Sequence, residues 1–324
     1  MKQRKSILTG CLCTVVLTFF FIYRLGVLVR PIDTDIALSA INSFHKLPKN
    51  SIEVIAYGSS HVWRGFVPME LYKQYGIGAY NYGCNWQHIN TTKLFIEDSL
   101  RTQSPKVILI ETFYINELQQ NVNMDGEIYY TRAIPISKEK IEYLKQCFGF
   151  DPERWLSYYV PLSAFHDNWV NLEKGSFRKS SDSTDFFASK GFVYTEGSIP
   201  IKLSDPELFK NKELDPAAVK ILDDITDLCK SKNIKIIFYT APMEGEFCYG
   251  NAMEEYASKH DCVYLNLFKH IEDIGIDCET DFCDADHLNY NGAVKVSDYL
   301  GRYIYENYNV SDMRAVTGNI WSGE

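Results

Sequence analysis

Five short apolar runs, rich in β-branched and aromatic residues, most constrain how this 324-residue chain can fold. They cover residues 52–57, 79–82, 107–110, 234–239 and 263–267. Segments with apolar residues at helical spacing or with helix-capping signals lie between and after them, at 71–75, 91–100, 215–229, 253–259 and 291–307. Strands that alternate with helices form parallel sheets covered by helices on both faces. The pattern therefore predicts an α/β fold, a three-layer α/β/α sandwich.

Residues 114–213 interrupt this alternation. They contain helical patterns around Lys138–Phe148 and Leu162–Lys174, followed by a polar, Ser/Lys/Gly-rich segment at 175–191. About one hundred residues are too many for a loop, so we expect an inserted subdomain. The predicted organisation is an anchor at 1–30, a core in two parts at 31–113 and 214–310, the insertion at 114–213 and a tail at 311–324.

The N-terminus contains an uncharged apolar run of 17 residues, Ile7–Tyr23, which resumes after Arg24 and continues to Val29. At about 1.5 Å per residue a helix over this stretch is roughly 34 Å long, enough to cross a bilayer. Three basic groups within the first five residues favour a cytoplasmic N-terminus and place the rest of the chain outside. A cleaved signal peptide is the alternative, but no A-x-A pattern follows the run. We expect a single-pass, uncleaved anchor in the cell membrane.

The charge and the cysteines exclude several classes of protein. After residue 30 the chain carries 28 basic against 42 acidic residues, a net charge of −14, which argues against nucleic acid as a partner. Seven cysteines lie outside the anchor, an odd number, so at least one thiol is expected to be free. Cys278 and Cys283 are close enough in sequence to close a small loop. No C-x-x-C pair is present, which argues against a zinc ribbon or a thioredoxin-like motif.

A serine motif follows the first strand, and a D-x-x-H motif precedes the last helix. Gly58-Ser59-Ser60-His61 directly follows residues 52–57, and Asp284 and His287 lie between the last strand and the last helix. Both motifs are expected at the carboxyl edge of the sheet, where ligands bind such folds. A serine becomes a nucleophile when an imidazole takes its proton and a carboxylate orients that imidazole. The sequence therefore predicts Ser60 as nucleophile, His287 as base and Asp284 as the orienting acid.

Such a reaction also needs hydrogen-bond donors for an oxyanion. The backbone N–H groups of Ser60 and of Gly83, which follows the second strand, are the predicted donors.

Other roles for these residues remain open at this point. Hard carboxylates with a histidine suit a divalent metal ion, but a metal site leaves the serine motif unexplained. The candidate ligands are Asp281, Asp284, Asp286 and His287. His61 is a possible second base, although adjacent residues on an extended chain point apart. Glu111, at the end of the third strand, is expected either to face the site or to pair with a basic residue.

These motifs resemble those of the SGNH (GDSL-like) hydrolase superfamily. Gly58-Ser59-Ser60 resembles its first block, with Ser59 where many members have Asp, while Gly83 resembles the second block and the D-x-x-H the last. The resemblance covers residues 52–110 and 215–307. The third block, G-x-N-D in many members, is replaced by Glu111-Thr112-Phe113-Tyr114. With no asparagine donor there, Asn85, Asn116 or a group from the insertion is a candidate replacement.

The anchor, the G-S-S motif, the long insertion and the D-x-x-H-L-N-x-x-G ending most resemble one branch of this superfamily. That branch includes membrane-anchored proteins of bacterial alginate O-acetylation and teichoic acid D-alanylation. The resemblance implies a flavodoxin-like sandwich and a serine-dependent O-acyl esterase or acyltransferase that needs no cofactor. It implies an envelope polysaccharide or glycopolymer as substrate and a multi-pass membrane O-acyltransferase as a candidate partner. The alternative is a non-catalytic glycan-binding or scaffold protein of an acylation or export complex.

Overall fold

The structure, a computed structural model, describes residues 2–30, 32–118, 127–172, 174–177, 185–316 and 320–321. Five strands form one sheet in the order β2-β1-β3-β4-β5, and every neighbouring pair is parallel. The strands are β1 Val54–Tyr57, β2 Ala79–Asn81, β3 Val107–Glu111, β4 Lys235–Thr240 and β5 Val263–Asn266. This confirms the predicted α/β fold, and the strand order is the flavodoxin-like one. The order reverses at β1, so the chain leaving β1 enters the crevice where such sheets bind ligands.

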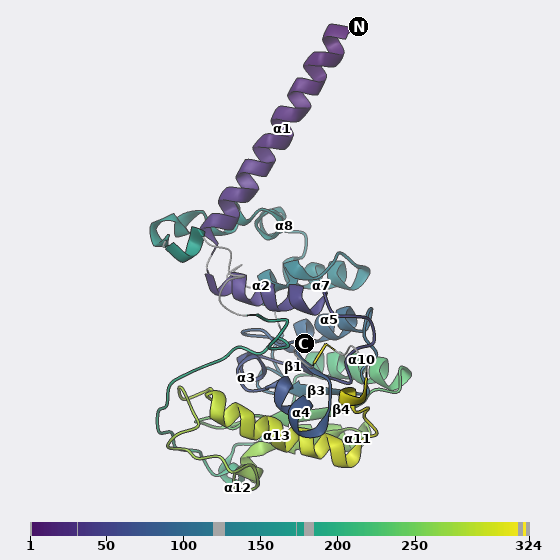
Figure 1. Cartoon of the computed structure of the whole chain (residues 1–324), viewed down its shortest axis with the longest axis vertical. Helices are drawn as coiled ribbons and strands as arrows, with labels where there is room; N and C mark the ends of the chain where they lie inside the picture. Colours follow the sequence, from purple (N-terminus) through teal and green to yellow (C-terminus); the bar gives the residue numbers. More distant parts are fainter. Residues whose placement is uncertain are drawn as a thin grey trace.

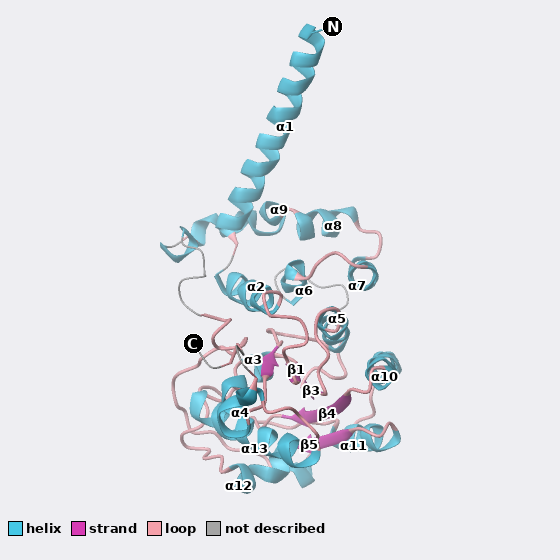
Figure 2. Ribbon diagram, turned by 45° about the vertical axis from the view of Figure 1, so that its right-hand side comes forward, coloured by secondary structure: helices cyan, strands magenta, loops and turns pink. Residues whose placement is uncertain are grey.

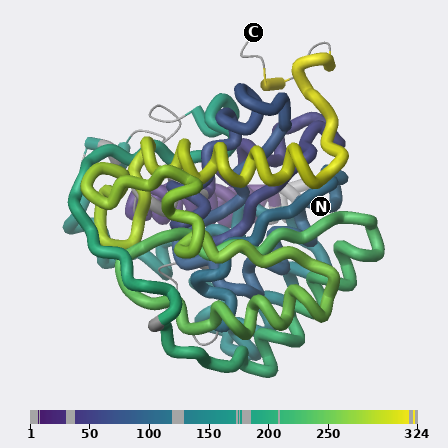
Figure 3. The backbone as a smooth tube through the Cα atoms, turned by 90° about the horizontal axis from the view of Figure 1, so that it is seen from below, coloured from purple at the N-terminus to yellow at the C-terminus, as the bar shows by residue number. Residues whose placement is uncertain are grey.

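Helices cover both faces of this sheet, and α1 projects from one end of the molecule (Figure 1). The helices of the described residues are α1 Lys2–Val29, α2 Ile32–Phe44, α3 Ser60–Trp63, α4 Pro68–Tyr75, α5 Ile89–Ser99, α6 Glu127–Tyr130, α7 Lys138–Phe148, α8 Pro152–Tyr159, α9 Pro161–Phe165, α10 Pro216–Ser231, α11 Gly250–Lys259, α12 Ile271–Ile274 and α13 Tyr290–Asn307. Helices α4 and α13 pack together on one face, and α5 and α10 pack together on the other. Figure 3, viewed from the end opposite α1, shows α13 in yellow across the front.

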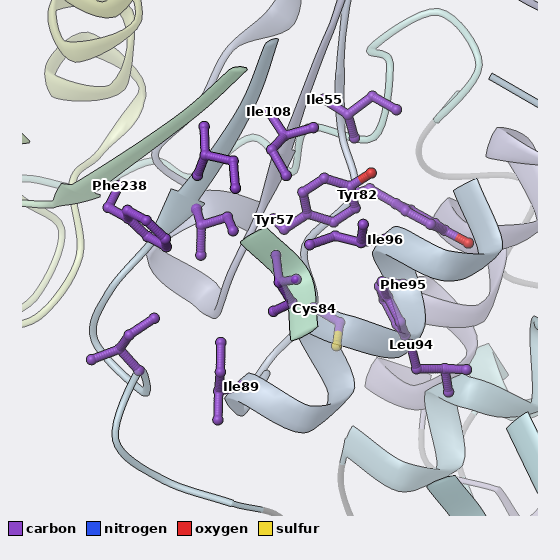
Figure 4. Close-up of a cluster of buried hydrophobic side chains, with 14 of the residues drawn as sticks. Ile55, Tyr57, Tyr82, Cys84, Ile89, Leu94, Phe95, Ile96, Ile108 and Phe238 are labelled. Atoms are coloured by element: carbon purple, nitrogen blue, oxygen red, sulfur yellow. The ribbon is translucent and has the colours of Figure 1, made fainter. Parts of the chain in front are cut away.

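Side chains of each strand alternate between two hydrophobic clusters. Val54 and Leu109 belong to the cluster under α4 and α13, which includes Leu300. Ile55 and Ile108 belong to the other cluster, shown in Figure 4 with Tyr82, Phe95 and Phe238. Burying an aliphatic or aromatic side chain of this size contributes about 1.5–3 kcal/mol. A sheet apolar on both faces accounts for the uninterrupted apolar runs in the sequence.

Helix signals in the sequence explain where several helices begin. α10 begins at Pro216 after Asp215, whose carboxylate accepts the Ala217 N–H at 2.7 Å, as the Asp-Pro pair predicts. α8 begins with the same pair, Asp151-Pro152, and sequence reasoning missed it. The helix predicted around residues 162–174 is wrong as one element. There α9 is followed by the 3₁₀ helices η2, His166–Asn171, and η3, Lys174–Phe177.

The second half of the predicted insertion runs along the core. The Asn81 N–H donates to the Lys190 carbonyl at 2.9 Å, and the Val193 N–H donates to the Trp63 carbonyl at 3.0 Å. Residues 178–184 of the predicted polar segment lie outside the described part of the chain. The boundaries of the insertion stay a prediction.

Candidate active site

The glycine after β1 allows the chain to turn sharply toward α3. Gly58 has φ +151°, and a Cβ there would lie 2.8 Å from the Glu111 Cβ and 2.7 Å from Val62. Any other residue would clash and strain the backbone at this point. Ser59 then caps α3, and Ser60 is its first residue. The turn places the Ser60 hydroxyl at the carboxyl edge of the sheet.

Ser60, His287 and Asp284 form one hydrogen-bonded chain, although the serine and the histidine are 227 residues apart. The His287 Nε2 lies 2.7 Å from the Ser60 Oγ. The other ring nitrogen, Nδ1, lies 2.8 Å from the Asp284 Oδ1. The structure therefore brings together the three side chains predicted for proton transfer, in the order that a Ser-His-Asp triad requires.

The loop before α13 holds Asp284 in place. Its Oδ1 also accepts the backbone N–H groups of Asp286 and His287, each at 2.9 Å. Burial raises the pKa of Asp284, but the hydrogen bonds from His287 and from the Asp286 N–H outweigh it, so the pKa lies below its usual value. The carboxylate is thus ionised in the neutral range and accepts a hydrogen bond from Nδ1–H, which leaves Nε2 free to accept the serine proton.

Two backbone donors lie near the nucleophile. The Ser60 N–H, at the start of α3, donates to no acceptor among the described residues. The Gly83 N–H donates to the Asn81 side-chain oxygen at a long 3.3 Å. The amide of Asn81 in turn donates to the carbonyls of Val62 at 2.6 Å and Phe66 at 2.8 Å. Asn81 therefore ties β2 to α3, a role that its sequence position did not reveal.

The two asparagines considered as replacement donors differ in their surroundings. Asn85 lies half-buried in the turn that follows Gly83 and stays a candidate oxyanion donor. The Asn116 side-chain oxygen accepts the Asp215 N–H at the start of α10, so its carbonyl group is already engaged.

A second buried polar set lies directly behind the triad. The Ser59 hydroxyl is 2.9 Å from the His61 Nδ1 and donates to the Glu111 Oε2 at 3.2 Å. The His61 ring stacks on the His287 ring, with centroids 5.2 Å apart and planes 25° apart. The expectation that His61 points away is wrong, because Ser60–Trp63 is a turn of helix and not an extended segment. Glu111 faces the site and pairs with Ser59.

Burial determines the ionisation states of His61 and Glu111 in this second set. It lowers the pKa of His61 to about 3, helped by the charge of His287 and opposed by the Asp286 backbone and Asp284. Burial also raises the pKa of Glu111 to about 8, against hydrogen bonds from the Phe113 N–H and Ser59. Both side chains are therefore mainly uncharged at neutral pH.

The raised pKa of Glu111 predicts that the stability of the folded protein depends on pH. A carboxyl whose pKa rises from 4.5 to about 8 on folding holds its proton more tightly in the folded state, so stability falls as pH rises through that range. The loss at high pH is on the order of 4 kcal/mol. We expect Glu111→Gln, a neutral mimic of the acid, to remove this loss. Urea unfolding of the full chain in detergent at pH 5 and pH 8.5 measures it.

Glu246→Gln, which alters an exposed carboxylate, is the matched control and should unfold with the same pH dependence as the wild type. If Glu111→Gln and the wild type lose stability equally between the two pH values, Glu111 is ionised in the folded protein and the assigned pKa is wrong.

The alternative metal site does not assemble. Asp281 is buried, bound to the Lys295 Nζ at 2.6 Å, and accepts the Asp277 N–H at 2.8 Å. No group of three histidine, cysteine or acidic side chains in the described ranges is placed to hold a metal ion. Cys278 and Cys283, close enough in sequence for a disulfide, are both free thiols.

An aromatic cleft of about 540 Å³ lies at the same edge of the sheet. Its walls are the segments that follow β2, β3 and β4, at residues 86–88, 113–117 and 243–249, together with Lys212. Phe113, on one wall, packs against His61 with ring centroids 4.5 Å apart. The Glu244 N–H donates to the Ala285 carbonyl at 2.7 Å, which ties another wall to the triad loop. The cleft therefore adjoins the triad through a ring contact with His61 and a hydrogen bond to the loop that carries Asp284 and His287.

Comparison with solved structures finds a chain from Bacteroides fragilis described as a "putative acylhydrolase". The similarity covers 81% of this chain and 92% of that chain, with 11% sequence identity and a TM-score of 0.39. No protein-family model matches the chain. No curated protein matches it either.

Proposed function

We propose that the protein is a serine-dependent O-acyl esterase or acyltransferase that acts on a carbohydrate of the cell envelope. The observation that carries the proposal is the 2.7 Å contact between the Ser60 Oγ and the His287 Nε2. Ser60 attacks the ester carbonyl carbon while its proton passes to Nε2. The alcohol then leaves with that proton, and an acyl group stays on Ser60 until water or a second hydroxyl accepts it.

The negative charge of the tetrahedral intermediate requires donors close to Ser60. The Ser60 N–H is free to supply one, because no described residue accepts it. The Gly83 N–H supplies a second when it exchanges its 3.3 Å bond to Asn81 for the shorter, charged bond to the oxyanion. Asn85 remains the candidate for a third.

The cleft supports a carbohydrate as the group that carries the ester. Trp86 stands at its wall with 61% of its surface exposed and with φ +60°, a conformation that a large residue rarely adopts. Its ring lies 6.0 Å from that of Tyr114. A Lys212 ammonium and the carboxylates of Glu117 and Glu246 also line the cleft. Flat rings beside polar groups suit a sugar, which has apolar faces and hydroxyl edges.

The N-terminal apolar helix α1 favours the proposal that the active site lies outside the membrane. Its segment Thr9–Val29 is long and apolar enough for a single membrane span or a signal sequence. The end of α1 is packed into the folded chain, because a Cβ at Gly26 would lie 2.4 Å from the Leu162 N. Such close packing favours a retained anchor over a cleaved signal. We propose that the acyl group comes from a multi-pass membrane acyltransferase when the reaction runs as a transfer.

The full chain in detergent should release acetate from an O-acetylated oligosaccharide and from 4-nitrophenyl acetate. Trp86→Ala should raise KM about 2- to 12-fold for the oligosaccharide, the loss expected for one aromatic contact of about 0.5–1.5 kcal/mol. It should leave the KM for the small aryl ester within about two-fold. Acetate release and acetyl transfer to an added unacetylated oligosaccharide are measured together, which separates the esterase from the transferase.

Phe150→Ala is the matched control, since Phe150 is an exposed aromatic residue outside the cleft and should leave both KM values unchanged. Equal KM increases for both esters in Trp86→Ala would contradict the sugar site. If neither ester is cleaved but the oligosaccharide binds, the non-catalytic glycan-binding alternative holds.

A further inference from the structure

The helices between Pro152 and Phe177 form a layer at the end of α1. Helices α8 and α9 lie across the base of α1 (Figure 2), and α9, η2 and η3 all contact it. We name the described residues 150–172 and 174–177 the α8–η3 layer. The layer is joined to α1 by the Gly26 contact and by the Asn168 side chain, which donates to the Val29 carbonyl at 2.7 Å.

Large apolar side chains of the α8–η3 layer are exposed. Phe150 is 97% exposed and Trp169 is 65% exposed, and three further residues of the layer expose more than half of their surface. These three are Leu156, Val170 and Phe177. A soluble surface rarely gathers so many large apolar groups in one short region, and such gatherings mark contacts with a protein or a membrane.

The burial of individual residues on α8 indicates which side of this helix is exposed. Tyr158 is fully buried and hydrogen-bonds Thr131 at 2.8 Å, so this side of α8 faces the core. Leu156 precedes Tyr158 by two residues, which places it on roughly the opposite side of the helix. In Figures 1 and 2, α8 lies at the level of the lower end of α1, on the α1 side of α7 and the sheet. The exposed Leu156 therefore lies on the side of α8 that is turned away from the core.

The position of Trp169 corresponds to the surface of a bilayer that α1 crosses. Its neighbour Asn168 binds the carbonyl of Val29, the last residue of the apolar span. Tryptophan concentrates at this depth because its ring is apolar and its N–H is polar. The layer is thus continuous with the proposed membrane contact of α1. We therefore expect lipid, and not a partner protein, to cover its exposed apolar side chains.

We propose that the α8–η3 layer is a membrane-surface platform whose exposed apolar side chains enter the headgroup–acyl boundary of the bilayer crossed by α1. The proposal rests on the membrane anchor assigned to α1 and is independent of the acyl chemistry at Ser60. Short helices with exposed aromatic and aliphatic residues bind this boundary by burying apolar area.

Tryptophan fluorescence of the full chain in lipid nanodiscs tests the platform. Discs made with phospholipids brominated near the top of the acyl chains should quench part of the emission. In Trp169→Phe, most of this quenching by brominated lipid should be lost. Trp86→Phe removes an exposed tryptophan of the cleft and should leave the quenched part unchanged. Acrylamide in the water should quench Trp86 emission and spare Trp169 emission.

The outcomes separate the platform from the anchor. A chain that fails to enter the discs, or whose mass shows the loss of residues 1–30, overturns both. A chain held in the discs whose Trp169 emission is quenched by acrylamide and not by brominated lipid overturns the platform and leaves the anchor. In neither case does the reactivity of Ser60 change, so a failure here is distinct from a failure of the proposed enzyme.

Discussion

We expect a fluorophosphonate probe to modify the full chain at one residue, Ser60. An imidazole at hydrogen-bond distance raises the nucleophilicity of a serine far above that of an ordinary surface hydroxyl, and His287 lies 2.7 Å away. Mass spectrometry of the peptide that contains Ser60 detects the label. Ser60→Ala and His287→Ala should each abolish labelling and lower kcat for ester cleavage roughly 10⁵- to 10⁶-fold. The double variant should lose little more, because the members of a triad act as a unit.

Ser59→Ala is the matched control, since it removes a neighbouring hydroxyl that contacts Glu111 and His61. It should keep the label on Ser60. A label on Ser59 would move the nucleophile by one residue and leave the reaction class standing. A folded chain that takes up no label would reject the serine mechanism and favour a glycan-binding protein.

Asp284→Asn should lower kcat about 10⁴-fold, while Asp286→Asn should change it less than ten-fold. An amide in place of the Asp284 carboxylate carries no negative charge, so it no longer stabilises the imidazolium that forms when Nε2 accepts the serine proton. Asp286 is exposed and contributes its backbone N–H to Asp284, which the substitution preserves. Initial rates with 4-nitrophenyl acetate measure both variants.

The same two variants also discriminate against metal catalysis. If both lose activity equally and excess divalent ion restores it, the carboxylates act as metal ligands and the triad is rejected. Thermal unfolding of each variant shows whether a loss of activity comes from a loss of folded protein.

The sequence predicted the sheet well because buried parallel strands are apolar on both sides. Residues 107–110 and 234–239 read as continuous apolar runs, and each forms a strand within one residue of that range. The meeting of Ser60, Asp284 and His287 was predictable for a related reason. Parallel strands end at one edge, so motifs after the first strand and before the last helix meet there, whatever their separation in sequence.

The set of Ser59, His61 and Glu111 was not predictable from the sequence. It depends on the register between β1 and β3, in which Tyr57 pairs with Ile110, so that Gly58 lies opposite Glu111. It also depends on α3, whose four residues are too few to show a helical period. The packing of α9 against α1 was hidden for a similar reason, because about 135 residues separate Gly26 from Leu162.

The close packing at Gly26 limits where the proposed enzyme can work. An anchor joined to its domain by a long tether lets the active site sample a wide volume, whereas α1 is fitted directly against α9. Under the proposed anchoring, Ser60 is held at a fixed height above the bilayer. Under the proposed function, its substrates are then restricted to glycan segments that come within one domain's thickness of the membrane, which favours newly exported or lipid-linked chains over mature polymer farther out in the envelope.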